Sequence, residues 1–277
     1  MTLTPPFSGH CLCGATRWRA EALPLWQGHC HCDSCRRATG AAMASYVGLD
    51  PNSVVWQGPP PVVHQSSPGT RWHRCATCGS PLAYFADRFP NEIHLHAATL
   101  DEPAAFAPEQ HFHAGDRLGW LHLADHLPYR IGPKDDLAQV LALIRDTFAY
   151  MEGRIDPPSS LNRLDLAALR NLAAQAEIWG IGGPLLGCVV LTPGADHLYL
   201  GKAAVARSAR GQGIGRALVS HAETRARALG LPELRLQVRV ELTETQAIWE
   251  RLGFLRTGAT AHDGYDRPTS YSYAKKV

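Results

Sequence analysis

The chain has 277 residues, of which 45% are hydrophobic and 19% charged, and its net charge is only +2. This composition is typical of a globular protein, and so small a charge argues against nucleic acid or an anionic membrane as a partner. The longest apolar stretch, 184–191, is far shorter than the roughly 20 residues of a membrane-spanning helix. The first residues lack the features of a signal peptide. We therefore expect a cytoplasmic protein.

Composition shifts along the chain and indicates two domains. No lysine occurs before Lys134, whereas eleven of the fourteen histidines lie at or before His126. Pro and Gly in the segment 127–134 predict a connector without regular structure. We expect one domain over residues 1–130 and a second over 134–277.

The first domain is predicted to be all-β. Short runs with alternating apolar residues are separated by Pro and Gly, and no helical period is found before residue 130. The expected strands cover 15–20, 44–48, 54–56, 61–65, 82–85 and 93–97. In the last of them His94 and His96 alternate with apolar residues, so we expect both to face solvent or a groove.

Seven of the eight cysteines fall in three clusters, at 11 and 13, at 30, 32 and 35, and at 75 and 78. Without export, close cysteine pairs predict metal ligands rather than disulfides. If Cys30 and Cys32 share a strand face and a turn brings Cys35 round, three thiolates would form a zinc site with an open position. A closed four-ligand site completed by His31, His29 or a distant residue is the alternative. Spacing does not decide which pair joins Cys75 and Cys78.

Four motifs together resemble the glutathione-dependent formaldehyde-activating enzyme family, to which centromere protein V also belongs. They are Gly9–Ala15 (GHCLCGA), Cys30–Gly40 (CHCDSCRRATG), Arg74–Leu82 (RCATCGSPL) and Thr99–Pro103 (TLDEP). The resemblance implies a tent-like all-β fold with two zinc sites. It implies that Cys11, Cys13, Cys75 and Cys78 hold a structural zinc, and that Cys30, Cys32 and Cys35 hold a second, open one.

An open zinc site predicts thiol chemistry. A thiol such as glutathione would lose its proton on binding there and add to a carbonyl such as formaldehyde, or the reverse reaction would break a carbon–sulfur bond. Arg36 and Arg37 are candidates for holding a carboxylate of the thiol. The alternative is a non-catalytic recognition module, because a fold does not by itself give an activity.

The second domain begins with two predicted helices, 136–151 and 164–176, followed by strands 185–191 and 197–205. A glycine-rich segment, Arg210–Gly215, then opens a third helix. It fits neither a dinucleotide fingerprint nor a Walker loop. Strand 234–240 follows, and Thr243–Gln246 reads as a capping box for a helix over 244–252 that ends at Gly253.

This run resembles the GCN5-related N-acetyltransferase (GNAT) superfamily. Arg210–Gly215 matches its R-x-x-G-x-G motif, and Trp249–Phe254 (WERLGF) matches a later signature. The resemblance implies an α/β fold with a central mixed sheet, acetyl-CoA as cofactor and a small amine or protein as acceptor. It implies that the strand ending at Val205 contacts the pantetheine arm, with Ala203, and that the pyrophosphate is bound by Arg210, Gly211, Gln212, Gly213, Ile214 and Gly215.

Two departures concern catalysis. Trp249 stands where the superfamily often has a tyrosine that protonates the leaving thiolate, and an indole cannot do so. Leu242 stands where asparagine is common. The candidate catalytic residues are Tyr199, Glu241, His262 and Tyr265. The sequence as a whole predicts a fused protein, with a carbon–sulfur lyase-like zinc domain followed by an N-acetyltransferase; the alternative is that only the acetyltransferase is an enzyme.

Overall fold

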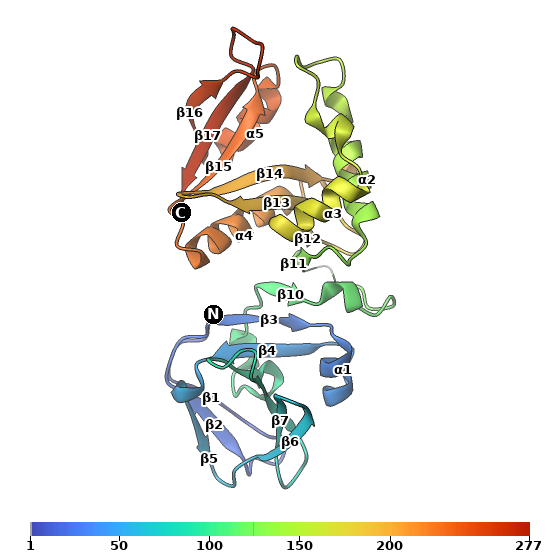
Figure 1. Ribbon diagram of the computed structural model, residues 1–277. Helices are drawn as coiled ribbons and strands as arrows, with labels where there is room; N and C mark the ends of the chain where they lie inside the picture. Colours follow the sequence, from blue (N-terminus) through green and yellow to red (C-terminus); the bar gives the residue numbers. More distant parts are fainter. Residues whose placement is uncertain (1, 124) are drawn as a thin grey trace. The chain divides into compact units, whose positions relative to one another are not determined.

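The computed structural model describes residues 2–123 and 125–277, and the chain divides into two units, Met1–Leu121 and His122–Val277 (Figure 1). Each unit has its own hydrophobic clusters. The two-domain organisation expected from composition is confirmed. Within the described ranges, no helix has both the length and the apolar character to cross a bilayer.

The first unit is built from two sheets. The larger has the order β10-β3-β4-β9-β8-β7-β6, with β10 and β3 parallel and the other pairs antiparallel. The smaller has the order β1-β2-β5. The strands are β1 (Phe7–His10), β2 (Arg17–Ala20), β3 (Trp26–Cys30), β4 (Ala44–Leu49), β5 (Val54–Gln57), β6 (Val62–Ser67), β7 (Thr70–Arg74), β8 (Pro81–Ala86), β9 (Ile93–His96) and β10 (Gln110–Phe112); 3₁₀ turns are η1 (Pro51–Ser53), η2 (Ala97–Thr99), η3 (Pro103–Ala105) and η4 (Ala114–Asp116).

The centre of the larger sheet is covered on both faces, which explains why β4 and β9 are buried almost throughout. Successive residues of β4 point to opposite sides, so Val47 joins one cluster together with Trp18 of β2. Tyr46 joins the cluster on the other side, with Trp72 and Tyr84. The predicted all-β fold is therefore confirmed in its main features.

Two local expectations in the first unit were wrong. Cys32 does not continue a strand but is the N-cap of a short helix, α1 (Asp33–Thr39), whose seven residues are too few to show a helical period in sequence. His96 faces neither solvent nor a groove, because it is 5% exposed on β9, which pairs with strands on both sides; His94, 8% exposed, does line a cavity, so the expectation of a groove holds for it.

The second unit has the sheet order β16-β17-β15-β14-β13-β12-β11, in which β14 and β15 are parallel and the other pairs antiparallel. This is the predicted central mixed sheet. Its strands are β11 (Pro128–Ile131), β12 (Glu177–Ile181), β13 (Gly187–Pro193), β14 (Leu198–Val205), β15 (Glu233–Arg239), β16 (Leu255–Thr260) and β17 (Ser270–Lys276).

Helices cover both faces of this sheet. Helices α2 (Leu137–Phe148) and α3 (Leu166–Gln175) pack on one face, against Ile178 and Val190. Helix α4 (Ile214–Ala228) packs on the other, against Val189 and Leu200, and α5 (Thr243–Arg251) follows β15. The 3₁₀ turns are η5 (Ala149–Met151), η6 (Ser160–Arg163) and η7 (Arg207–Ala209).

Two further expectations are corrected in the second unit. The segment 127–134 is not an irregular connector throughout, because Pro128–Ile131 forms β11 and pairs with β12. The capping box at Thr243 is absent: the N-cap of α5 is Leu242, and no side chain caps it. The Gln246 amide instead donates to the backbone carbonyls of Arg239 and Val240, which fixes the end of β15 against α5.

Candidate functional site

Four thiols of the first unit meet at two matching turns. Cys11 and Cys13 lie on one turn and Cys75 and Cys78 on the other; each turn ends in a glycine, Gly14 or Gly79, with φ of +73°. A backbone N–H lies 3.4 Å from the first sulfur of each pair, that of Thr16 at Cys11 and that of Thr77 at Cys75.

The spacing of these sulfurs fits a zinc ion. The Cys11 and Cys13 sulfurs lie 3.5 Å apart, and those of Cys13 and Cys75 lie 3.8 Å apart. Four sulfurs about 2.3 Å from a tetrahedral zinc are roughly 3.8 Å from one another. All four ligand atoms lie within 4.8 Å of one another. The group therefore has the donors and the geometry of a closed structural site.

Cys30, Cys32 and Cys35 form a second group, again with all sulfurs within 4.8 Å. Cys30 ends β3, Cys32 caps α1, and Cys35 lies on the first turn of that helix. Hydrogen bonds from the other two thiols lower the pKa of Cys32 to about 2. Burial raises the pKa of Tyr46, so its hydroxyl stays protonated beside the three thiols. Three thiols that stabilise a thiolate suit a soft cation such as zinc.

The three-thiol group opens on a cavity of about 600 Å³, whereas the four-thiol group does not line it. The cavity wall is mainly aromatic, and its polar side chains include a cation, a carboxylate and an imidazole. The aromatic residues are Trp26, Tyr46, Trp72, Tyr84, Phe89 and Phe112; the polar ones include Arg88, Glu92 and His94.

Small residues and hydrogen bonds hold the aromatic wall in place. A Cβ on Gly48 would lie 2.3 Å from the Trp26 ring, so only glycine lets this ring pack flat on β4. The Trp26 indole donates to Glu92 at 2.8 Å, and the His94 ring nitrogen lies 3.0 Å from the same carboxylate. Burial lowers the pKa of His94.

The predicted arginine pair does not line this cavity. Arg36 donates to the backbone carbonyls of His31 and Asp116, and Arg37 is paired with Asp33 at the surface. The cation in the wall is Arg88, which donates to the Tyr84 hydroxyl at 3.1 Å. No motif surrounds Arg88, so sequence reasoning missed it.

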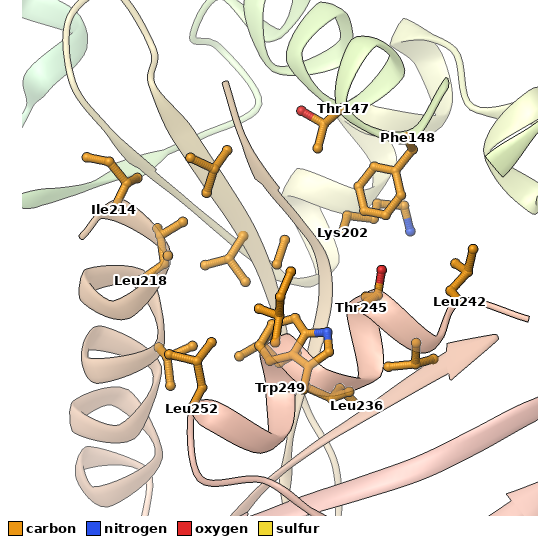
Figure 2. Close-up of a pocket in the computed structure, with 18 of the residues that line it drawn as sticks. Thr147, Phe148, Lys202, Ile214, Leu218, Leu236, Leu242, Thr245, Trp249 and Leu252 are labelled. Carbon is orange, nitrogen blue, oxygen red and sulfur yellow. The ribbon is translucent and has the colours of Figure 1, made fainter. Parts of the chain in front are cut away.

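The second unit contains a cavity where two parallel strands part. Pairing between β14 and β15 is confined to Leu198–Leu234 and Tyr199–Arg235. Beyond these positions both strands continue, and their ends border a cavity of about 630 Å³. Figure 2 shows Trp249 reaching into it from α5, with Ile214 and Leu218 of α4 on one side and Thr147 and Phe148 of α2 above.

The glycine-rich segment forms the mouth of this cavity. Gly211 and Gly213 have φ of +78° and +87°, which only glycine adopts without strain, and Gly213 is the N-cap of the 15-residue α4. Of the predicted cofactor residues, Ala203, Val205, Arg210, Gly211, Gly213, Ile214 and Gly215 line the cavity. Gln212 does not; its amide donates to the Ser208 carbonyl.

The four catalytic candidates are distributed unevenly. Tyr199 lines the cavity, and burial raises its pKa. Glu241 lies 3.7 Å from Arg239, which lines the cavity. His262 contacts Thr269 in the β16–β17 connection, and Tyr265 donates to Asp156 at 2.6 Å. Neither His262 nor Tyr265 lines the cavity.

Four polar side chains that line this cavity were not among the predicted site residues. The Tyr150 hydroxyl lies 2.9 Å from Thr245 of α5, and both line the cavity together with Lys202 and Arg239. Lys202 has φ of +49° at an irregularity of the β13–β14 pairing, and burial lowers its pKa. These side chains reach the cavity because β14 and β15 separate there, and no local sequence pattern predicts that separation.

Fold and sites define a protein of two classes: a β unit with two thiol groups suited to zinc, joined to an α/β acyltransferase unit. Residues 6–116 match the family model described as "Glutathione-dependent formaldehyde-activating enzyme", and residues 138–254 match "Acetyltransferase (GNAT) family". A protein of Halomonas elongata, named as a candidate glutathione-dependent formaldehyde-activating enzyme, is 30% identical over 125 residues, covering 42% of this chain and 79% of that protein. The chain belongs to the glutathione-dependent formaldehyde-activating enzyme family through its first unit, and its second unit is a GNAT acetyltransferase domain.

Solved acetyltransferase structures are similar to the chain at low identity. The PaiA N-acetyltransferase of Thermoplasma acidophilum, in complex with coenzyme A, is 17% identical with a TM-score of 0.45, covering 54% of this chain and 98% of that one. A GNAT family acetyltransferase of Elizabethkingia anophelis, with acetyl-CoA bound, is 15% identical with a TM-score of 0.41, covering 55% and 99%.

Proposed function

We propose that the chain is a bifunctional enzyme that acts on a thiol–aldehyde adduct in its first unit and transfers an acetyl group from acetyl-CoA to an amine in its second. The observation that carries the first half is the difference between the two thiol groups. Four thiols close around one point, whereas three border a cavity of about 600 Å³. A site that leaves a ligand position towards a cavity suits catalysis rather than structure.

Cys30, Cys32 and Cys35 would hold zinc, which when bound would supply a Lewis-acidic position for a substrate thiol. The remaining roles would be carried out by side chains of the protein. The Tyr46 hydroxyl, which burial keeps protonated, would face these sulfurs as a neutral group. Arg88 would bind a carboxylate of a thiol such as glutathione. His94, held by Glu92, is placed to move a proton at the carbonyl oxygen of an aldehyde such as formaldehyde.

In the second unit, the N-terminus of α4 and Arg210 would bind the pyrophosphate of acetyl-CoA. The parted ends of β14 and β15 would align the pantetheine arm and place its thioester near Tyr150. Because Trp249 has no acidic proton to give, the Tyr150 hydroxyl is the better donor to the leaving thiolate. Both thiol groups of the first unit need reduced cysteines to bind zinc, which favours a reducing compartment such as the cytoplasm.

The alternative is that the first unit only binds zinc and recognises a partner, leaving the acetyltransferase as the only enzyme. The aromatic cavity beside the three thiols favours the catalytic proposal, because a recognition module has no need of an open metal position inside a pocket.

A thermal-shift titration of the full chain tests the acetyltransferase half. Acetyl-CoA at about 100 times its Kd should raise the melting temperature by about 5–10 °C. Gly213→Ala should abolish the shift, because φ of +87° at the mouth of the cavity is strained for alanine. Gly230→Ala is the matched control, since Gly230 has φ of +68° but lies outside the cavity. No shift in the unmutated chain would refute this half.

A further inference from the structure

Arg239 is the most unusual charged residue of the second cavity. It ends β15, lines the cavity and is only 9% exposed. Among the described residues, its Nε and Nη2 atoms have no hydrogen-bond partner and are shielded from water. A buried guanidinium with an unsatisfied edge is costly, and because Arg239 also lines the cavity, this edge is a candidate for binding a ligand once it is uncovered.

The unsatisfied edge is the one that binds carboxylates. Elsewhere in this unit Arg225 uses the same two atoms, Nε and Nη2, to hold both oxygens of Glu177, at 2.9 and 2.7 Å. This parallel arrangement of two N–H groups matches the two oxygens of a carboxylate. Arg239 therefore presents a fork that is already seen to bind a carboxylate in this chain.

A carboxylate with a free oxygen lies beside that fork. Glu241 Oε2 is 3.7 Å from Arg239 Nε, which is too long for a hydrogen bond, and Oε2 is itself buried without a partner. Its other oxygen, Oε1, accepts the backbone N–H of Asp156 at 3.1 Å, which holds Glu241 in this position. A cation and an anion thus lie side by side, each with an unused hydrogen-bonding edge.

We propose that the acyl acceptor of the second unit is an amino acid, whose carboxylate binds Arg239 and whose amino group lies beside Glu241. The proposal rests on the proposed acetyltransferase function and names its substrate class. An α-amino acid carries a carboxylate and an amine on one carbon, which is the charge complement of the Arg239–Glu241 pair. Acetylation forms an amide bond, breaks the thioester and releases CoA. The bound ammonium loses two protons in all: one before attack, for which Glu241 Oε2 is the proposed acceptor, and one as the amide forms, which balances the proton taken up by the leaving CoA thiolate.

The loop that carries Asp156 lies against Glu241 and is held by a second loop. Asp156 accepts hydrogen bonds from Tyr265 at 2.6 Å and from Arg267 at 2.8 Å. The Asp156 and Arg267 side chains are 62% and 50% exposed, and ion pairs this exposed contribute little stability. The contacts that must part for an acceptor to enter are therefore weak ones.

The test compares acids with matched amides on the unmutated full chain. With acetyl-CoA saturating, CoA release is followed with each L-amino acid, with the carboxamide of each, and with simple amines that lack a carboxylate. We expect at least one amino acid to be acetylated with kcat/KM about 10- to 100-fold above that of its amide, the range for a charged bidentate hydrogen bond. Equal or better rates with the amide or simple amine, or no acetylation of any amino acid, overturn the proposal.

Variants then assign the effect to Arg239. Arg239→Gln should raise KM for the acid about 10- to 100-fold while leaving the rate with the amide within a few-fold. Arg239→Lys should restore part of the affinity, because it keeps the charge without the fork. Arg227→Gln, on the exposed side of α4, is the control. A uniform loss for acid and amide would indicate a structural role and contradict the proposal.

Failure of the acceptor proposal can be distinguished from failure of the proposed acetyltransferase function. If acetyl-CoA does not raise the melting temperature, the proposed function is wrong and the acceptor proposal falls with it. If acetyl-CoA does stabilise the chain and amides react as well as acids, only the acceptor proposal is wrong.

Discussion

At the scale of single residues, each site contains buried polar side chains whose hydrogen-bonding or ligand positions are not all used by the protein. Cys35 is buried on the first turn of α1 yet borders a cavity, and the buried Tyr46 hydroxyl in the same cavity wall has no hydrogen-bond partner among the described residues. Arg239 is buried with its carboxylate-binding edge unused. Such positions are expected where a ligand completes the structure.

Replacing Cys35 by serine separates the two zinc sites. We expect Cys35→Ser to lose about one zinc per chain and to keep its fold, because three-ligand sites contribute less to folding than closed ones. Cys78→Ser should instead lower the melting temperature sharply, since it opens the site that joins residues 11 and 78. Metal analysis and circular dichroism check both variants, with Ser34→Ala as control. Unfolding of Cys35→Ser, or unchanged zinc, would contradict an open site.

The cysteine ligands could be predicted from sequence, because metal spacing is local: two turns ending in glycine and one helix N-terminus bring each group together. Arg88, Tyr150 and Arg239 could not. Each enters its cavity from an element far from the recognisable motif, and its partners depend on how strands pair or part. Arg36 shows the reverse case, since a residue next to the motif points to backbone carbonyls rather than into the cavity.

At the scale of elements, Glu177 connects strands to a helix in the second unit. This carboxylate on β12 accepts hydrogen bonds from Arg225 of α4 and from Trp179, and is paired with Arg130 of β11 at 3.2 Å. Burial favours the neutral acid, but these partners outweigh it, and the pKa of Glu177 is lowered. Glu177 therefore stabilises the fold as a carboxylate.

Glu177→Gln should lower the free energy of unfolding by about 1–3 kcal/mol at pH 7. Because the folded pKa lies below the unfolded value, the stabilising effect is complete above about pH 5 and is lost as the pH falls through the folded pKa. The difference between the two proteins in urea unfolding should therefore shrink on acidification. Asp146→Asn, at an exposed 4.0 Å ion pair, serves as control. A difference that grows in acid would contradict this account.

Elements were predicted best where a periodic pattern is long. Helices α2 and α3 and strands β14 and β15 lie close to their expected bounds, because amphipathic periods and buried runs extend over several turns or residues. Short elements were not predicted. Helix α1 has only seven residues, too few for a clear period, and β11 begins at a proline, which usually indicates a break. The apparent capping box failed because Gln246 found backbone carbonyls of the preceding strand instead.

At the scale of the whole molecule, the chain joins two units with separate chemistry. Each has its own core and its own cavity, of about 600 and 630 Å³, beside its own motif. The two families were recognisable because their motifs are dense in cysteine and glycine, residue types whose spacing reflects metal geometry and backbone conformation rather than burial alone.

Zinc release from the unmutated full chain tests the central claim most directly, that one closed and one open thiolate site coexist. With a chelator in excess and a colorimetric zinc indicator, we expect about two zinc ions per chain, released in two phases of similar amplitude. The faster phase should come from Cys30, Cys32 and Cys35, whose site borders the cavity. A total of about one zinc, or a single phase for both ions, would contradict the account.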